Sequence, residues 1–569
     1  MAARLHLLLS LLVWQLSSFC VHSWTPAGVS FVGIGYNILD GNPDGGDPNA
    51  GGVDPGLLVT RRILEFSYED GNLSEDGIYP IPDEVLFSPR DSCSEVETTE
   101  IFEGTKSYQE KLERDIDYSF SGDHILLGYQ FSKSGRYERI YESTEYQKKV
   151  FHDYKKVCNK GQARYLTELA AIDGYELARD FVASACALPE VYDEAEYMNF
   201  LDLWGTDIVV EVDLGTKLSN RSEIYQTDFV FYAMKEKSNT VSPGGNFLTY
   251  KGSVVVDMNK FRQESGQETT FGSYQELISV GTPDLPEPIS VKLMYISDVF
   301  HSKYWSQIDS YVSSGSCNAD HSSQLAAKKQ NVFTALTNYG KWRNALISDD
   351  PPVQIPITWP IGTYSLPMVE SKGTGCPDSH FSWKAGSRFQ DTENYLSDNH
   401  WSDPCHLRGP YKRNDITQNF CSKTVEYEDS YQWEWGEGTY CIFKKGTSCP
   451  AGFDEGWIYW NDENTFNSNW LSGELPTGIY DEDTQIYFCC REDGFATNPI
   501  YMPIDDVFFL FKKNHLCQEV AGMTYVEEYM EWDNENEIFD GRTMGGSYPY
   551  NTDKSENHIL HYCYYYPKA

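Results

Sequence analysis

The sequence has little positive charge for its length. Its 569 residues include 45 lysines and arginines against 85 aspartates and glutamates, which gives a formal net charge of -40 at pH 7. A protein that binds nucleic acid carries a basic surface toward the phosphates, so this class of partner is excluded. Anionic lipid would repel the same surface at long range, so membrane contact needs shape, apolar surface or a receptor.

Long apolar runs are also missing after the first residues. No later run reaches the roughly 18 to 20 residues that a membrane-spanning helix needs. The chain opens with Arg4 and an apolar run from Leu5 to Val13, and small residues follow up to Ser23. This pattern predicts a signal peptide over 1–23, cleaved after Ser23, and therefore a secreted, extracellular protein.

Signatures of catalysis are absent as well. The 12 histidines are scattered, and neither an HExxH nor a GxSxG pattern occurs. Gly33-Ile34-Gly35 is not a dinucleotide-binding loop, because no helical pattern follows it. We therefore expect no enzyme activity, no cofactor and no metal site.

Cysteine is well represented, with 14 residues, most of them after residue 375. In an exported chain these predict disulfides. Because Cys20 leaves with the signal peptide, an odd number remains, and one thiol is expected to be free, intermolecular or inaccessible. The sequons at Asn72 and Asn220 predict glycosylation sites.

The composition changes at a proline-containing stretch, which predicts a linker over 346–356. Before it, alternating apolar residues predict strands at 125–131, 208–214 and 289–295. Apolar residues at helical spacing between 177 and 185 predict a helix that ends at Pro189.

The last third of the chain contains three similar segments about 70 residues apart, at 389–399, 459–469 and 531–541. Each has a Glu-Asn pair after an aromatic residue: Glu393-Asn394, Glu463-Asn464 and Glu535-Asn536. We interpret them as three β-rich pseudo-repeats. The pairs are either ligand residues, suited to sugar hydroxyls, or residues that close turns by bonding backbone amides.

Each segment has a cysteine before it and an aromatic-Cys pair after it. The spacing favours the bridges Cys376–Cys421, Cys449–Cys489 (or Cys490) and Cys517–Cys563. Asp481-Glu482-Asp483 is rich in oxygen ligands of the kind that calcium prefers, although no complete calcium-loop pattern matches.

One motif resembles a known family. Tyr197, six intervening residues and Trp204-Gly205-Thr206-Asp207 resemble the membrane attack complex/perforin (MACPF) signature, in which His is usual at the position of Asp207. The segments "GYNILDGNP" and "PEPISVKLMYISDVF" resemble the same family. Residues 357–569, with "GTYCIFKKGTSCPAGF" and "CQEVAGM", are similar to the apextrin C-terminal (ApeC) domain. The order of the two parts is that of coral and marine-invertebrate apextrins.

The resemblance implies an α+β fold. Residues 24–345 would form a MACPF domain with a bent, twisted four-stranded antiparallel sheet and two helical clusters. The clusters would lie at about 125–190 and 222–275 and would unfurl into transmembrane hairpins of a β-barrel pore. Residues 357–569 would form a β-rich, disulfide-stapled recognition domain.

The implied function is a secreted pore-forming protein of innate defence or toxin type. It would recognise a microbial or cell-surface glycan, assemble as a homo-oligomeric ring and act on a target-cell lipid bilayer. The alternative is a non-lytic adhesion or recognition protein that uses the MACPF domain as a scaffold. Asp207, if buried in the hinge of the sheet, would hold its partners when ionised, which suggests that acid favours assembly.

Overall fold

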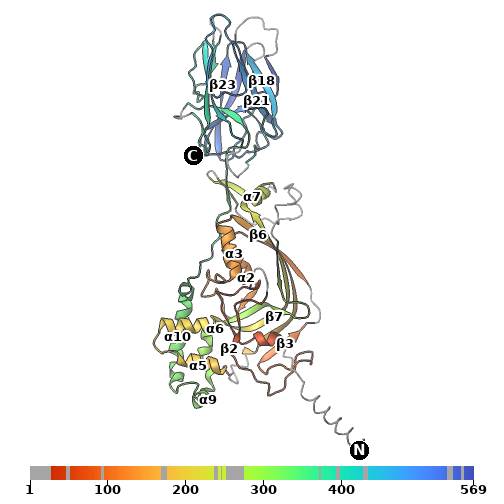
Figure 1. Ribbon diagram of the computed structural model, residues 1–569, viewed down its shortest axis with the longest axis vertical. Coiled ribbons are helices and arrows are strands. Elements are labelled where there is room, and N and C mark those ends of the chain that lie inside the picture. Colours follow the sequence, from red (N-terminus) through yellow and green to blue (C-terminus); the bar gives the residue numbers. More distant parts are fainter. Residues whose placement is uncertain are drawn as a thin grey trace, which may run out of the picture. The chain divides into compact units, whose positions relative to one another are not determined.

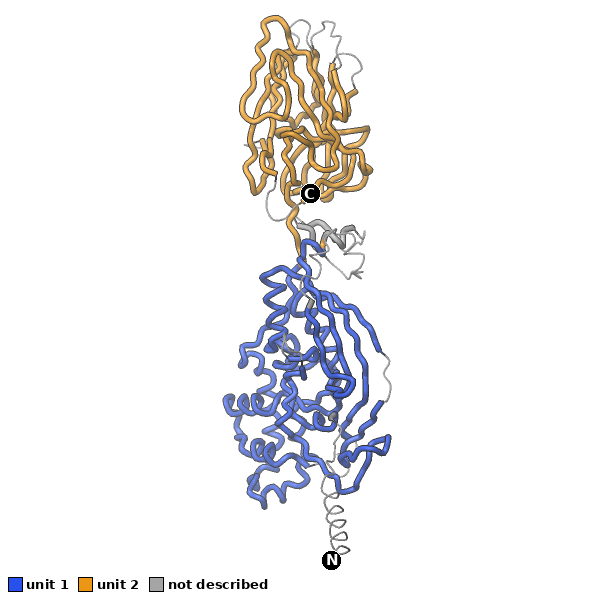
Figure 2. Tube along the Cα trace, turned by 45° about the vertical axis from the view of Figure 1, so that its right-hand side comes forward, with its two compact units in different colours: residues 1–229, 256–352 blue, residues 230–255, 353–569 orange. Residues whose placement is uncertain are grey.

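The structure is a computed structural model of the chain. It describes residues 27–46, 52–90, 95–167, 176–235, 241–244, 247–250, 275–370, 373, 375–392, 398–426, 433–534, 543–552 and 557–568. The chain divides into two compact units, coloured in Figure 2: residues 1–229 with 256–352, and residues 230–255 with 353–569.

The first unit is built on a sheet in which two long strands are central. β6 (Lys149–Tyr165) and β7 (Asp207–Tyr225) pair along almost their whole length. β7 also pairs with β11 and β10, and β11 pairs in parallel with β5. The other strands of this sheet are β1 (Ile34–Tyr36), β2 (Leu57–Arg62), β3 (Val85–Pro89), β4 (Val96–Phe102), β5 (Ile116–Tyr118), β10 (Gln275–Val280) and β11 (Glu287–Tyr295).

Two groups of helices accompany this sheet (Figure 1). α2 (Thr105–Glu113) and α3 (Gly135–Glu145) lie between β4 and β6 in the chain. α5 (Arg179–Ala187), α6 (Glu194–Trp204) and α10 (His321–Trp342) form the second group. The other helices among the described residues are η1 (Ala27–Phe31), α7 (Gln226–Lys235), η2 (Ile296–Phe300), η3 (Ser302–Trp305) and α9 (Ile308–Ser313). Among the described helices, none combines the length and the apolar character that crossing a bilayer requires.

Several sequence predictions for this unit hold, and others are wrong. The strands at 208–214 and 289–295 are present in β7 and β11, and the predicted helix is α5. The segment 125–131 is a series of turns and not a strand. Its apolar residues do not share a face, since Leu127 is 53% exposed and Phe131, on the same face of the predicted strand, is 0% exposed.

The position of the first helical cluster was also wrong. The segment 125–190 contains β6, which is a central strand of the sheet, so it is not a helical cluster throughout. The helices that precede β6 are α2 and α3, and they lie within 103–148. The second predicted cluster, 222–275, begins inside β7 and continues into α7. Its residues 251–274 lie outside the described residues. The described sheet joins nine strands rather than four.

The second unit is β-rich. Its main sheet contains β13 (Tyr364–Pro367), β14 (Lys384–Asp391), β15 (His400–Trp401), β16 (Asp415–Lys423), β17 (Thr439–Lys444), β18 (Asp454–Trp460), β19 (Trp470–Gly473), β20 (Gly478–Tyr480), β21 (Thr484–Glu492), β22 (Phe508–Lys512), β23 (Met523–Trp532), β24 (Met544–Gly546) and β25 (His558–Pro567). β8 (Val241–Gly244), β9 (Phe247–Tyr250) and β12 (Gln354–Pro356) form a separate three-stranded sheet.

Four disulfides close loops within this unit. They are Cys376–Cys421, Cys441–Cys490, Cys449–Cys489 and Cys517–Cys563. Cys489 and Cys490 are adjacent in β21 and therefore point to opposite faces of the strand, into two different apolar clusters. This alternation decides which of the two pairs with Cys449. Cys405 is the free cysteine among the described residues.

In the first unit, a disulfide and a buried cation tie the helices of the second group together. Cys186 of α5 is bonded to Cys317, just before α10. Lys328 of α10 donates from Nζ to the carbonyl of Cys186 (3.0 Å), and the same Nζ lies 3.1 Å from His321 Nδ1. Burial and the charge of Lys328 lower the pKa of His321 to about 4.

The stability of the first unit should therefore fall in mild acid. In the folded protein the pKa of His321 lies below its ordinary value of 6.5, so protonation favours the unfolded state. The folded state therefore loses stability as pH falls from 6.5 toward 4. We expect a loss of up to about 3 kcal/mol from this group. Urea unfolding between pH 4.5 and 7.5 measures it, and His321→Gln should flatten the dependence. An unchanged slope in that variant would contradict the assignment.

Candidate functional site

The signature residues form a corner between α6 and β7. α6 ends at Trp204, and Gly205 follows with φ of 91°, a conformation that favours glycine. A Cβ on Gly205 would lie 2.5 Å from the carbonyl oxygen of Tyr36 in β1. The amide of Thr206 donates to that same oxygen at 2.8 Å. The corner is therefore fixed by a close backbone approach that excludes larger residues at position 205.

Asp207 lies at the start of β7 and is fully buried. The hydroxyl of Thr206 donates to its Oδ2 at 2.7 Å. His124 Nε2 lies 3.1 Å from its Oδ1, and this histidine is also buried. The partner that the sequence hypothesis left unnamed is thus His124, from the turns between β5 and α3. A single histidine in "SGDHILL" gave no signal of this role.

The two aromatic residues of the signature contact residues of the second group of helices. Tyr197 donates from its hydroxyl to the carbonyl of Pro189 at 2.6 Å and accepts from Asn331 of α10 at 3.1 Å. The indole of Trp204 packs edge-on against Phe181 of α5, with ring centroids 5.2 Å apart. These contacts join α5, α6 and α10 to the corner.

A network of buried charges lies between α2 and the long strands. Lys111 of α2 donates from Nζ to Oδ2 of Asp44 and Oδ2 of Asp153, each at 2.6 Å. Arg221 of β7 also contacts both carboxylates, at 3.0 and 2.8 Å. All four side chains are at most 3% exposed. Burial would raise the pKa of Asp44, but Lys111 and Arg221 outweigh it and hold that pKa well below its ordinary value.

α3 is held in a similar way. Arg136, which is buried, pairs with Glu276 of β10 and donates from Nε to the carbonyl of Gly45 at 3.0 Å. Arg139 contacts Glu223 of β7 at 3.2 Å. The buried faces of α5 and α6, in contrast, contain no charged residue. Sequence reasoning missed these charges, because a buried lysine and an exposed one look alike in a sequence.

The candidate glycosylation sites differ in their surroundings. Asn72 lies in an exposed loop, and its side-chain amide donates to Asp83 at 3.0 Å. Asn220 lies within β7, where β6 and β10 flank it on both sides. This placement favours Asn72 as a site for a bulky glycan.

Of the three Glu-Asn pairs, only Glu463-Asn464 lies within the described residues. Glu463 is buried, and its Oε1 accepts from the amide of Thr465 at 2.7 Å, which is the turn-closing role. Its own amide donates to the carbonyl of Asp391 at 2.8 Å, so the first two similar segments touch. Glu393, Asn394, Glu535 and Asn536 lie outside the described residues.

The acidic cluster suggested for calcium is engaged within the protein. Asp483 accepts from the hydroxyl of Tyr459 at 2.6 Å and from the amide of Asp462 at 3.1 Å. In the part of the chain that the structure describes, Cys186, Cys317 and His321 are the residues grouped closely enough to share a metal ion. The two cysteines form a disulfide, so they offer no thiolate ligands.

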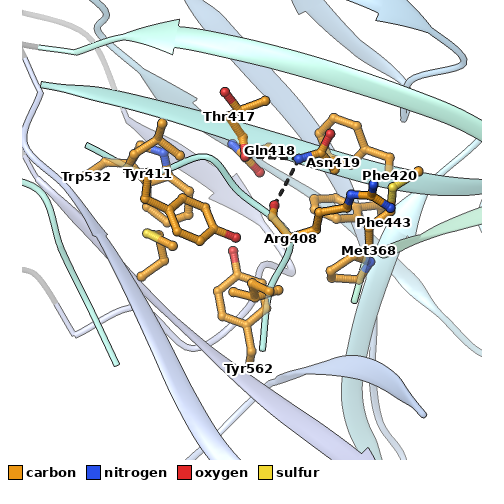
Figure 3. Close-up of a pocket in the computed structure, with 14 residues that line it drawn as sticks. Met368, Arg408, Tyr411, Thr417, Gln418, Asn419, Phe420, Phe443, Trp532 and Tyr562 are labelled. Atoms are coloured by element: carbon orange, nitrogen blue, oxygen red, sulfur yellow. Dashed lines mark hydrogen bonds between the residues drawn. The ribbon is translucent and has the colours of Figure 1, made fainter. Parts of the chain in front are cut away.

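Two cavities lined by described residues lie in the second unit. The first has a volume of about 20 Å³, enough for about one water molecule, and it is shown in Figure 3. The hydroxyls of Tyr411 and Tyr562 point toward each other in it. The second has a volume of about 130 Å³ and is lined by Ile361, Glu434, Trp435, Pro450, Ala451, Gly452 and Arg491. The first is too small for a sugar ring.

The pairing of Asp207 with His124 can be tested by a double-mutant cycle. Asp207→Asn should lower the free energy of unfolding of the first unit by about 3 kcal/mol, because one partner of a buried pair is lost. Combined with His124→Gln, the cycle should show a coupling energy of at least about 1 kcal/mol. Asp202→Asn is the control, since its half-exposed carboxylate pairs with Arg343 and should cost less than about 1 kcal/mol. Additive effects of the two substitutions would contradict the pairing.

The comparisons with known proteins agree with this geometry. Residues 25–345 match the family model of the MAC/Perforin domain, and residues 359–565 match that of the C-terminal domain of apextrin. Both are families without catalytic activity. No curated protein matches the chain.

Three solved structures are similar over long stretches. GNIP1Aa from Chromobacterium piscinae is 12% identical, with 93% of this chain and 92% of that chain covered and a TM-score of 0.36. A putative cell invasion protein with a MAC/Perforin domain from Bacteroides thetaiotaomicron is 13% identical, with 62% and 66% covered and a TM-score of 0.28. Astrotactin-2, a vertebrate-specific, perforin-like membrane protein, is 10% identical, with 84% and 69% covered and a TM-score of 0.25.

The MAC/Perforin match covers more than half of the chain and contains the corner, the long strands and both groups of helices. The second match covers the disulfide-bonded β-rich unit almost from end to end. The chain therefore belongs to the MAC/Perforin family and carries a MAC/Perforin domain followed by an apextrin C-terminal domain, which is an apextrin-like architecture.

Proposed function

We propose that the protein is secreted, recognises a microbial or cell-surface glycan through its C-terminal domain, and assembles into an oligomeric membrane pore. The observation that carries the proposal is the MAC/Perforin match over residues 25–345, together with two helices held on the sheet by paired charges. Superfamily membership supports a capacity for membrane binding and oligomerisation.

The electrostatics support a separate recognition step. A net charge of -40 opposes approach to anionic lipid and keeps monomers apart in solution. A domain that binds a surface glycan would raise the local concentration of the protein and overcome both effects. The disulfides of the second unit suit an extracellular environment.

The segment that would leave the sheet first is 103–148, which contains α2 and α3. Its buried cations pair with carboxylates on the sheet side, and water could solvate both halves after separation. α5, α6 and α10 would stay in place, because apolar contacts, the Cys186–Cys317 bridge and the hydrogen bond from Lys328 to Cys186 hold them together. A second candidate function, adhesion without a pore, uses the same two domains and is an outcome of the test below.

Dye release separates the two functions. Liposomes that carry glycans extracted from bacterial walls or animal cell surfaces are mixed with the full-length protein between pH 4 and 8. We expect binding, ring-shaped oligomers and release of the dye. Protein that binds these liposomes but never forms rings or releases dye at any pH would identify the non-lytic alternative.

The recognition step has its own test. A variant without residues 357–569 should lose binding to the same glycan-bearing liposomes, because the apextrin-like domain is removed. Circular dichroism checks that the shortened protein is folded. Binding equal to that of the full-length protein would place recognition elsewhere in the chain.

A further inference from the structure

The chain does not leave the first unit directly after α10. It runs past α2 and α3 (Figure 1), and the amide of Ser348 donates to the carbonyl of Gly128 at 2.7 Å. Two residues later it reaches the N-terminus of α2. We call residues 347–350 the strap. The longer segment of the second unit begins three residues after the strap, at Val353.

The N-terminus of α2 needs acceptors that its own sequence does not supply. The first amides of a helix have no partner within the helix, and the residue before it usually offers a side-chain oxygen. In α2 that residue is Gly104, which has no side chain. A Cβ at this position would lie 2.6 Å from the Cα of Asp350, so the glycine also makes room for the strap.

The strap supplies these acceptors. Oδ1 of Asp350 accepts from the amides of Lys106 and Ser107, each at 3.0 Å, and from the hydroxyl of Ser107 at 3.1 Å. The carbonyl oxygen of Asp349 accepts from the amide and the hydroxyl of Thr105, each at 2.9 Å. The first amide that bonds within the helix is that of Tyr108, which donates to Gly104. The strap thus caps the first three amides of α2 from a distance of more than 240 residues in the chain.

Hydrogen bonds, rather than apolar burial, keep the strap in place. Ile347 is 66% exposed and Leu346, just before the strap, is 43% exposed. Because the carboxylate of Asp350 and the amides of α2 can both be solvated by water, separating them exposes little apolar surface. The strap can therefore separate from α2 without unfolding the sheet.

We propose that the strap is a latch that keeps α2 docked, and that its displacement frees the N-terminal turn of α2 for release from the sheet. The paired Pro351-Pro352 stiffen the short connection to the second unit, so a pull on that unit acts directly on Asp350. The latch deepens the proposed function, and only its consequence for membrane insertion rests on that function.

Hydrogen exchange of the full-length protein in solution tests the latch without a membrane. Asp350→Ala should speed exchange of the amides of residues 105–108 about 5- to 30-fold, as expected for the loss of a helix cap. Asp350→Asn should stay within about threefold of the parent, because asparagine also caps helices.

Asp349→Ala is the matched control. It removes the neighbouring carboxylate, which accepts a hydrogen bond from the amide of Asp350 within the strap. It keeps the backbone carbonyl of residue 349, which accepts from Thr105. Exchange in β6 and β7 should stay unchanged in all three variants. Equal exchange at 105–108 in Asp350→Ala and the parent, or equal acceleration in Asp349→Ala, would overturn the latch.

A second experiment measures dye release from the glycan-bearing liposomes. If the parent releases dye, Asp350→Ala should release it faster and Asp349→Ala at the parent rate. Release that is unaffected by Asp350→Ala would overturn the role of the strap in insertion. Absence of release from every variant, with the exchange result as expected, would count against the proposed pore function and leave the latch supported.

Discussion

The pairing of buried charges is the constraint on which the first unit depends. β6 and β7 carry Asp153, Lys217 and Arg221 into the space below α2, where water cannot reach them. Such groups are costly to bury unless each finds a partner, and a good apolar interface would be at least as stable. In the observed position of α2, Lys111 meets both Asp44 and Asp153. These charges also keep both surfaces compatible with water.

The two groups of helices therefore differ in the physics of their attachment. α5 and α6 bury uncharged faces, and the bridge between Cys186 and Cys317 ties α5 to the segment before α10. α2 and α3 bury apolar residues too, but their buried faces also carry ion pairs, and α2 receives hydrogen bonds from a passing segment. The two groups therefore differ in the amount of buried charge at their contact with the sheet. The second unit resembles the group of α5 and α6, with four disulfides and two apolar clusters on either side of its strands.

The sequence predicted those elements whose pattern has a local cause. The alternation in 208–214 reflects burial along β7, and the glycine at 205 reflects a backbone φ of 91° at the end of α6. It failed where partners come from distant segments. Residues 125–131 have the alternating pattern of a strand but form turns, because His124 contacts Asp207 and the amide of Phe131 donates to the carbonyl of Ile38. Nothing near Gly104 indicates that Asp350 will cap the helix.

β7 is 19 residues long, and at about 3.3 Å per residue its two ends lie up to about 60 Å apart along the strand. The Gly205 corner fixes one end, and α7 continues from the other. Between them the strand bonds β6 on one side and β11 and β10 on the other. β7 is thus held along its length, so a twist near Asp207 has to be shared by β6, β10 and β11 before it reaches Tyr225.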